Sequence, residues 1–79
     1  MHFDIKAVLH FVAVAEDMSF TRAARRLGIA QPWLSRRIRQ LEEQLGFALF
    51  ERTTRSIELT ARGRGFLDAA REVASAVEA

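Results

Sequence analysis

The side chains with the clearest chemical potential are arginines gathered in the segment "AQPWLSRRIRQLEEQLG", residues 30 to 46. In chain order its charged residues are Arg36, Arg37, Arg39, Glu42 and Glu43. A guanidinium group is planar, and its N–H donors match the geometry of a phosphate or of a guanine edge. The basic first half of this segment therefore predicts contact with a polyanion. We expect the acidic second half to leave that contact and to lie in solvent.

Charge is divided in the same way along the rest of the chain, although the net charge is only +2. Residues 19–41 hold six arginines and no acid, residues 42–51 hold three acids and no base, and residues 52–64 hold four arginines against one acid. Solvated helix faces can produce the same pattern, so charge alone leaves a nucleic-acid partner and a solvated surface both open.

Length and composition argue against a multidomain protein, a membrane protein, a disulfide-bonded protein and an enzyme. A chain of 79 residues forms at most one small domain, of modest stability unless it associates. The absence of cysteine excludes disulfides and thiolate metal sites and fits a reducing, cytoplasmic compartment. No stretch reaches the ~18 apolar residues of a membrane span, and the first residues do not read as a signal peptide. His2 and His10 are not spaced as metal ligands on one helix face, and no catalytic constellation is evident. We expect no enzyme activity, no metal and no cofactor.

Three short helices are predicted to position the arginines. They span residues 4–16, 20–27 and 31–45, with Asp4 and Ser19 as N-caps, Pro32 in the first turn of the third helix, and Gly28 and Gly46 as terminators. The third helix carries apolar residues at 34, 38, 41 and 45, which form one narrow stripe at helical spacing. Arg36 and Arg39 project from the side opposite this stripe, where they are free to meet a partner.

A hairpin and a fourth helix are predicted after Gly46. Two short runs, 49–52 and 57–59, enclose a polar Thr-Thr-Arg-Ser centre, and Thr60 then caps a helix. The apolar positions that could pair two copies of the chain are Phe11, Val14, Phe66, Ala70, Val73 and Val77. Packing of the fourth helix on the first within one chain is the alternative for these residues, and both can hold together.

Two short helices joined by "LGIA", with the second entered by "QPWLSRR", are typical of a helix-turn-helix, and the arginine-rich hairpin makes it a winged one. The second helix of such a unit enters the DNA major groove. Residues 11–67 resemble the N-terminal DNA-binding domain of LysR-type transcriptional regulators. The motifs that carry the resemblance are "FVAVAE", "SFTRAA", "QPxLSR", "LEEQLG", "LFER" and "LT", in that order.

The resemblance implies a mainly α fold: a winged helix-turn-helix over 1–60, with a three-helix core and a β-hairpin wing, and a long linker or dimerisation helix over 61–79. It implies that residues 31–45 lie in the major groove of double-stranded DNA and residues 49–59 at the adjacent minor groove. A homodimer on an inverted-repeat operator follows, with a tetramer in the full-length regulator and a small-molecule effector bound only by a further domain. The compartment implied is the bacterial cytoplasm, at the nucleoid.

Individual site residues follow from residue type and from the family's motif. The predicted base contacts are Gln31, Pro32, Trp33, Ser35, Arg36 and Arg55, and the predicted phosphate contacts are Thr21, Arg22, Arg37, Arg39 and Arg52. A glutamine can form paired hydrogen bonds with adenine, and an arginine with guanine. Ser35 and Arg36 match the family's base-proximal pair, and Arg55 matches its minor-groove position. The alternatives are a solvated helix start at Gln31, simple helix initiation by proline, a surface ion pair for Arg36 and a solvated loop for Arg55.

Three residues depart from the family's pattern. Trp33 replaces a small residue or proline, and can either press on the DNA or pack back against the second helix. Ala30 replaces a frequent serine, so the third helix is expected to lack a side-chain cap. Arg62 stands in the first turn of the fourth helix, where the helix dipole opposes a cation, and pairing with Glu58 or a phosphate is expected. Arg25 and Arg26 are expected to solvate the second helix.

A winged helix that docks protein or RNA is the main alternative to a DNA-binding domain. Such a module would carry acids or an apolar patch on the exposed face of its third helix. Here that face holds Arg36 and Arg39 and no acid before Glu42, which favours DNA.

Overall fold

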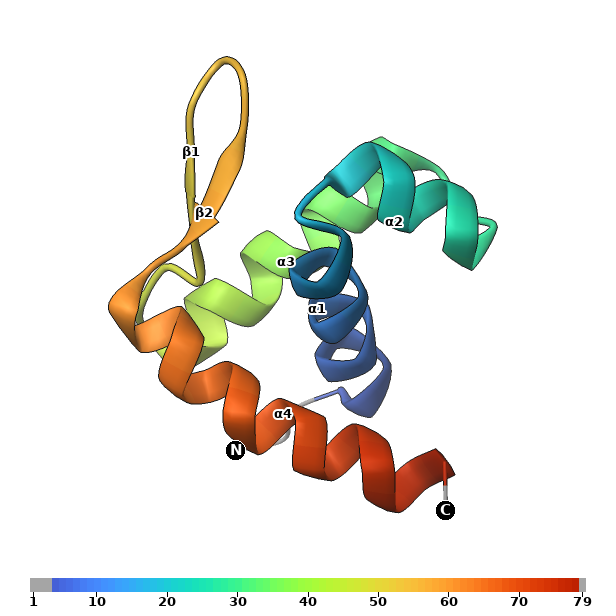
Figure 1. Ribbon diagram of the computed structural model, residues 1–79, viewed down its shortest axis with the longest axis vertical. Helices are drawn as coiled ribbons and strands as arrows, with labels where there is room; N and C mark the ends of the chain where they lie inside the picture. The colour runs from blue at the N-terminus through green and yellow to red at the C-terminus, as the bar shows by residue number, and fades with distance from the viewer. Residues whose placement is uncertain (1–3, 79) are drawn as a thin grey trace.

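Four helices and one β-hairpin make up residues 4–78, the part of the chain that the computed structural model describes (Figure 1). In chain order they are α1 (Ile5–Asp17), α2 (Phe20–Leu27), α3 (Gln31–Leu45), β1 (Phe50–Arg52), β2 (Ile57–Leu59) and α4 (Ala61–Glu78). The winged helix-turn-helix prediction is therefore confirmed, with element ends within one residue of those expected up to the fourth helix. None of the helices within 4–78 is long and apolar enough to cross a membrane.

The predicted helix ends are explained by local backbone bonding. Asp4 accepts a hydrogen bond from the Lys6 amide, and Ser19 accepts one from the Arg22 amide, as N-caps do. Gly28 and Gly46 end α2 and α3 in left-handed conformation, with φ of 72° and 84°. As expected, Ala30 gives α3 no side-chain cap. Short-range rules therefore set where the helix-turn-helix pair begins and ends.

The core is built around α1, which packs against α2, α3 and α4. Phe11 of α1 has no exposed surface, and its ring lies 5.5 Å from the rings of both Phe50 and Phe66, centroid to centroid. The apolar stripe of α3 is buried at Leu34, Ile38 and Leu41, as predicted.

This packing corrects part of the predicted dimer face. Phe11 and Val14 are 0% exposed, and Ala70 is 1% exposed, all within a single chain. Side chains enclosed in this way have no surface to offer a second copy, so their apolar character reflects the core alone. Phe66 and Val73 are half-buried, and Val77 is 56% exposed. The exposed part of the predicted dimer face thus lies on α4.

The wing is a two-stranded antiparallel hairpin that pairs Phe50 with Leu59 and Arg52 with Ile57. Its loop is closed by Thr53, whose amide donates to the Ser56 carbonyl (2.9 Å) and whose hydroxyl oxygen accepts from the Ser56 amide (3.0 Å). The hairpin projects away from the helices (Figure 1).

The start of α4 is pressed against the chain segment that leads into β1. Thr60 caps the helix, because its hydroxyl accepts from the Gly63 amide (2.9 Å) while donating to the Ala48 carbonyl (2.6 Å). Gly63 is buried, and a Cβ atom there would lie 2.2 Å from the carbonyl oxygen of Leu49. Only glycine allows this approach without a shift of the backbone.

Replacing Gly63 with alanine should therefore destabilise the fold by about 1–3 kcal/mol, the usual cost of overpacking a well-packed site. Gly65→Ala is the matched control, because a Cβ at Gly65 meets nothing within 4 Å. That control should stabilise α4 by about 0.5–1 kcal/mol, since alanine loses less conformational entropy than glycine in a helix. Chemical denaturation followed by circular dichroism measures both changes, and equal effects of the two substitutions would contradict the packing described.

Candidate nucleic-acid interface

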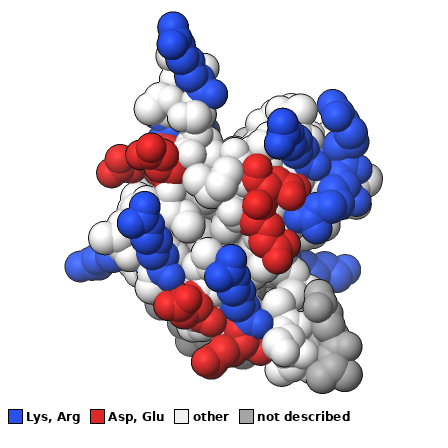
Figure 2. All heavy atoms as spheres, viewed as in Figure 1, with Lys and Arg blue, Asp and Glu red and all other residues white. Residues whose placement is uncertain are grey.

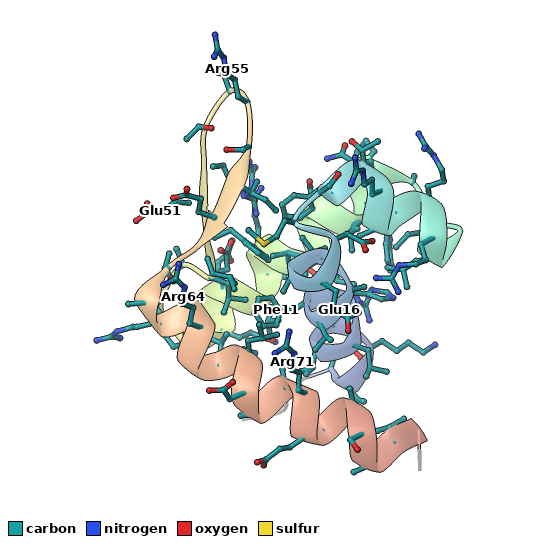
Figure 3. The ribbon with its side chains drawn as sticks, viewed as in Figure 1. Phe11, Glu16, Glu51, Arg55, Arg64 and Arg71 are labelled. Carbon is teal, nitrogen blue, oxygen red and sulfur yellow. The ribbon has the colours of Figure 1, made fainter. Side chains whose placement is uncertain are left out.

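Three segments with predicted contacts line one groove between the wing and the helix-turn-helix pair. Phe20 and Thr21 contribute from α2, Gln31 from the start of α3, and residues 53–57 from the wing. The structure thus brings together Thr21, Gln31 and Arg55, which are separated by up to 34 residues in the sequence. Arg55 stands at the tip of the hairpin and points away from the body (Figure 3).

The exposed face of α3 carries two unpaired arginines. Arg36 and Arg39 are both exposed, on the side opposite the buried stripe. Within residues 4–78 neither makes an ion pair within 4 Å. Their charges are therefore available to an external anion. Pro32 is also exposed, in the first turn of the helix.

Two of the predicted base contacts are hydrogen-bonded to each other. The side-chain amide of Gln31 donates to the Ser35 hydroxyl at 3.0 Å, one helical turn away, and both residues are half-buried. A partner that engages either side chain must keep this bond or replace it. The pair therefore behaves as one polar unit at the start of α3.

Trp33 packs against α1. Its ring meets the ring of His10 edge-on at 5.8 Å, and the Arg37 guanidinium carbon lies 4.9 Å from its centroid. Arg37 also forms an ion pair with Asp4, and its side chain is only 17% exposed. Arg37 therefore holds α3 to the start of α1, and its contact with a phosphate stays a prediction. Trp33 remains 40% exposed.

Arg52 is likewise engaged within the chain. Its Nη2 lies 3.6 Å from Oε1 of Glu42, and its guanidinium carbon lies 4.6 Å from the centroid of the Phe20 ring. Burial lowers the pKa of Arg52, and the Glu42 carboxylate opposes that shift. Arg52 therefore links the wing to both α2 and α3 and has limited freedom to reach a phosphate.

Glu42 was expected in solvent and is instead mostly covered, with a side chain 14% exposed. Its Oε2 accepts hydrogen bonds from the amides of Leu49 (2.7 Å) and Phe50 (3.3 Å), where β1 begins. Glu43, the next residue, is exposed as expected. Helical phase is the one signal in the sequence that separates the covered glutamate from the exposed one, because it places Glu42 beside the buried Leu41.

On α2, the predicted contacts Thr21 and Arg22 are exposed. Arg26 is exposed, as expected, and it also forms ion pairs with Asp17 (3.1 Å) and Glu16 (3.5 Å); its pKa is raised chiefly by the hydrogen bond to Asp17. Figure 2 shows basic side chains at the tip of the wing and in a group at the outer edge beside α2, whereas acidic and basic side chains alternate over the lower part of this face.

Arg62 stacks on an aromatic ring. Its guanidinium carbon lies 5.5 Å from the centroid of Phe47, and within residues 4–78 it makes no ion pair with Glu58. A cation–π contact therefore takes the place of the expected carboxylate partner.

The arrangement of a three-helix core, an exposed third helix and a projecting hairpin defines a winged helix-turn-helix protein. A family model described as "Bacterial regulatory helix-turn-helix protein, lysR family" matches residues 5–64. The chain belongs to the LysR family. It is 54% identical over 76 residues to the HTH-type transcriptional regulator IlvR of Caulobacter vibrioides, and 47% identical over 78 residues to the uncharacterized HTH-type transcriptional regulator YnfL of Escherichia coli K12. These matches cover 96% and 99% of the chain but only 26% of each relative, so the chain spans about a quarter of their length.

Solved structures give the same assignment. The DNA-binding domain of BenM in complex with catB site 1 DNA superposes with a TM-score of 0.92 at 45% identity, covering 96% of this chain and 85% of that one. The CbnR DNA-binding domain in its DNA complex gives 0.91 at 39% identity, covering 96% and 87%.

His10 gives the cluster around Trp33 a sensitivity to pH. Its Nδ1 is buried without a hydrogen-bond partner among the described residues. Burial lowers the pKa of His10, the nearby Arg37 and Lys6 charges lower it further, and Asp4 acts in the opposite direction. The folded chain therefore favours the neutral imidazole.

Stability should fall as the pH is lowered from 7.5 to 5.5. The unfolded chain binds a proton at His10 near its ordinary pKa of 6.5, whereas the folded chain binds it only at lower pH, so acid favours unfolding. Chemical denaturation at several pH values measures this slope. His10→Gln should flatten it while retaining His2, and identical slopes for the two proteins would contradict the assignment.

Proposed function

We propose that this chain is the sequence-specific, double-stranded-DNA-binding domain of a bacterial transcriptional regulator, and that it binds without catalysing a reaction. The observation that carries the proposal is the pair of exposed arginines on α3, Arg36 and Arg39, which have no ion-pair partner within residues 4–78 and lie opposite the stripe that fixes this helix to the core. DNA complexes of two domains with this fold support it. In this proposal α3 lies in the major groove and the wing at the adjacent minor groove.

Within this proposal, the residues divide by their freedom to reach DNA. Gln31, Ser35 and Arg36 read base edges from the start of α3, with Pro32 and the exposed edge of Trp33 beside them. Arg55 enters the minor groove, where narrow A·T tracts attract arginine. Phosphate contacts come from Thr21, Arg22 and Arg39, which position the domain without reading sequence.

We further propose that α4 pairs two copies of the chain. An apolar groove between α1 and α4 is lined by Ile5, Val8, Phe66, Ala69, Ala70 and Val73. Ile5 and Val77 are 47% and 56% exposed, so this side of the molecule retains apolar surface that a second copy would cover. Residues 1–60 then form the DNA-binding unit and 61–79 the dimerisation helix. Tetramer assembly and recognition of a small-molecule effector belong, in this proposal, to parts of the regulator outside these 79 residues.

Selection of bound duplexes from a random-sequence pool at about 150 mM salt tests the proposal, because specific binding must exceed the salt-sensitive, charge-driven background. We expect enrichment of an inverted repeat whose halves lie one helical turn apart or a multiple of it. A single enriched half-site would retain sequence readout and remove dimerisation by this chain. No enrichment would contradict specific readout and favour a module that docks protein or RNA.

Arg36 and Arg39 should differ in what their removal does. Arg36→Ala should cost about 1–3 kcal/mol of binding free energy and relax the preference at one base pair. Arg39→Ala should weaken binding to all sequences alike and reduce the salt slope by about one unit, as loss of one phosphate contact does. Fluorescence anisotropy with the selected site and single-base variants, at several salt concentrations, separates the two. An unchanged base preference in Arg36→Ala would contradict the placement of α3.

A further inference from the structure

The Glu42 side chain, near the end of α3, contacts the β1 strand of the wing. One carboxylate oxygen accepts from two consecutive backbone amides, those of Leu49 and Phe50, at 2.7 and 3.3 Å. The other oxygen lies 3.6 Å from the Arg52 guanidinium. A single side chain from the end of α3 therefore holds β1 and the residue before it at three points.

A carboxylate suits this place better than any other side chain. It presents only acceptors, and here it faces only donors: two amides and a guanidinium. Glutamine has nearly the same shape, but its NH2 group would face donors on one side. It would leave Arg52 unpaired, or an amide unsatisfied, at a site that is mostly covered.

The wing depends on attachments of this kind, because a hairpin of two short strands is marginal by itself. Thr60 fixes the end of β2, since its amide donates to the Leu49 carbonyl at 2.9 Å. Glu42 fixes the start of β1 on the side of α3. The five residue steps from Phe50 to Arg55 extend up to about 16 Å at 3.3 Å per step, so a tilt of about 10° at the base moves the tip by about 3 Å.

We propose that Glu42 is a positioning residue for DNA recognition: it sets the angle between α3 and the wing, so that Arg55 reaches the minor groove while Arg36 lies in the major groove. The inference rests on the proposed function. Glu42 itself need not touch DNA, and it acts through β1 and Arg52. Its exposed neighbour Glu43 carries the same charge without these bonds and serves as the matched control.

The test compares Glu42→Gln and Glu43→Gln, each with and without Arg55→Ala, by anisotropy well below the melting temperature. The probes are duplexes that carry the selected half-sites with A·T, G·C or inosine·cytosine pairs where the wing lies. Inosine·cytosine lacks the guanine amino group that marks G·C in the minor groove, so it reports minor-groove reading alone. Glu42→Asp keeps the charge but shortens the reach, and it decides the matter if Glu42→Gln does not fold.

We expect Glu42→Gln to abolish the preference for A·T and inosine·cytosine flanks while the half-site preference set by Arg36 survives. In the Arg55→Ala background the same change should alter affinity by less than about twofold, because the contact it positions is already gone. Glu43→Gln should leave every preference unchanged. Hydrogen exchange at the Leu49 and Phe50 amides should quicken in Glu42→Gln only.

Uniform weakening by Glu42→Gln on all duplexes, with flank preference intact, would overturn the positioning role and leave a stability role. If Arg55→Ala leaves the flank preference unchanged, the wing does not read the minor groove. That result would overturn the wing's part in the proposed function, and this inference with it. The two failures are distinguishable, because the second appears in the single Arg55 variant.

Discussion

Burial of the Phe11 ring is the interaction on which the other elements depend. From α1 it meets Phe50 of the wing and Phe66 of α4, and Phe50 in turn meets Phe20 of α2 at 5.7 Å. A chain of this size buries a smaller fraction of its surface than a large domain does, so a single aromatic cluster carries much of its cohesion. The wing and α4 therefore share one aromatic contact point on α1, in addition to the contacts that they make with each other at the start of α4.

The arginines around this core fall into two groups that residue type does not distinguish. Arg37 and Arg52 are held by carboxylates and stacked on aromatic rings, while Arg36 and Arg39 have no partner among the described residues. Engaged arginines orient the recognition elements, and unpaired ones supply their charge. The arginines of one basic sequence block thus serve both the fold and the proposed DNA contact. Which of the two roles an arginine has depends on its partners in the folded chain.

Element boundaries could be predicted because caps, terminating glycines and helical spacing act within a few residues. The partners of single side chains could not. Arg37 is paired with Asp4, which lies 33 residues away, and Glu42 bonds to amides seven and eight residues ahead, across a turn. Nothing local marks such pairs, so residue type and spacing alone predict a phosphate contact for Arg37 and solvent for Glu42. Phe11 was assigned to a dimer face for the same reason, since an apolar position does not say which surface will cover it.

The change from arginine to glutamate along α3 therefore has a second meaning. In the proposed complex it marks where the helix stops facing the DNA and becomes the support of the wing. Arg36 and Glu42 are six residues apart, about 9 Å along the axis, on one rigid helix. A flexible connection would let the helix and the wing find their grooves separately, with an ordering cost for each. Because α3 carries both the reading face and the anchor of the hairpin, the two contacts are made by one preorganised body, and that cost is met during folding instead.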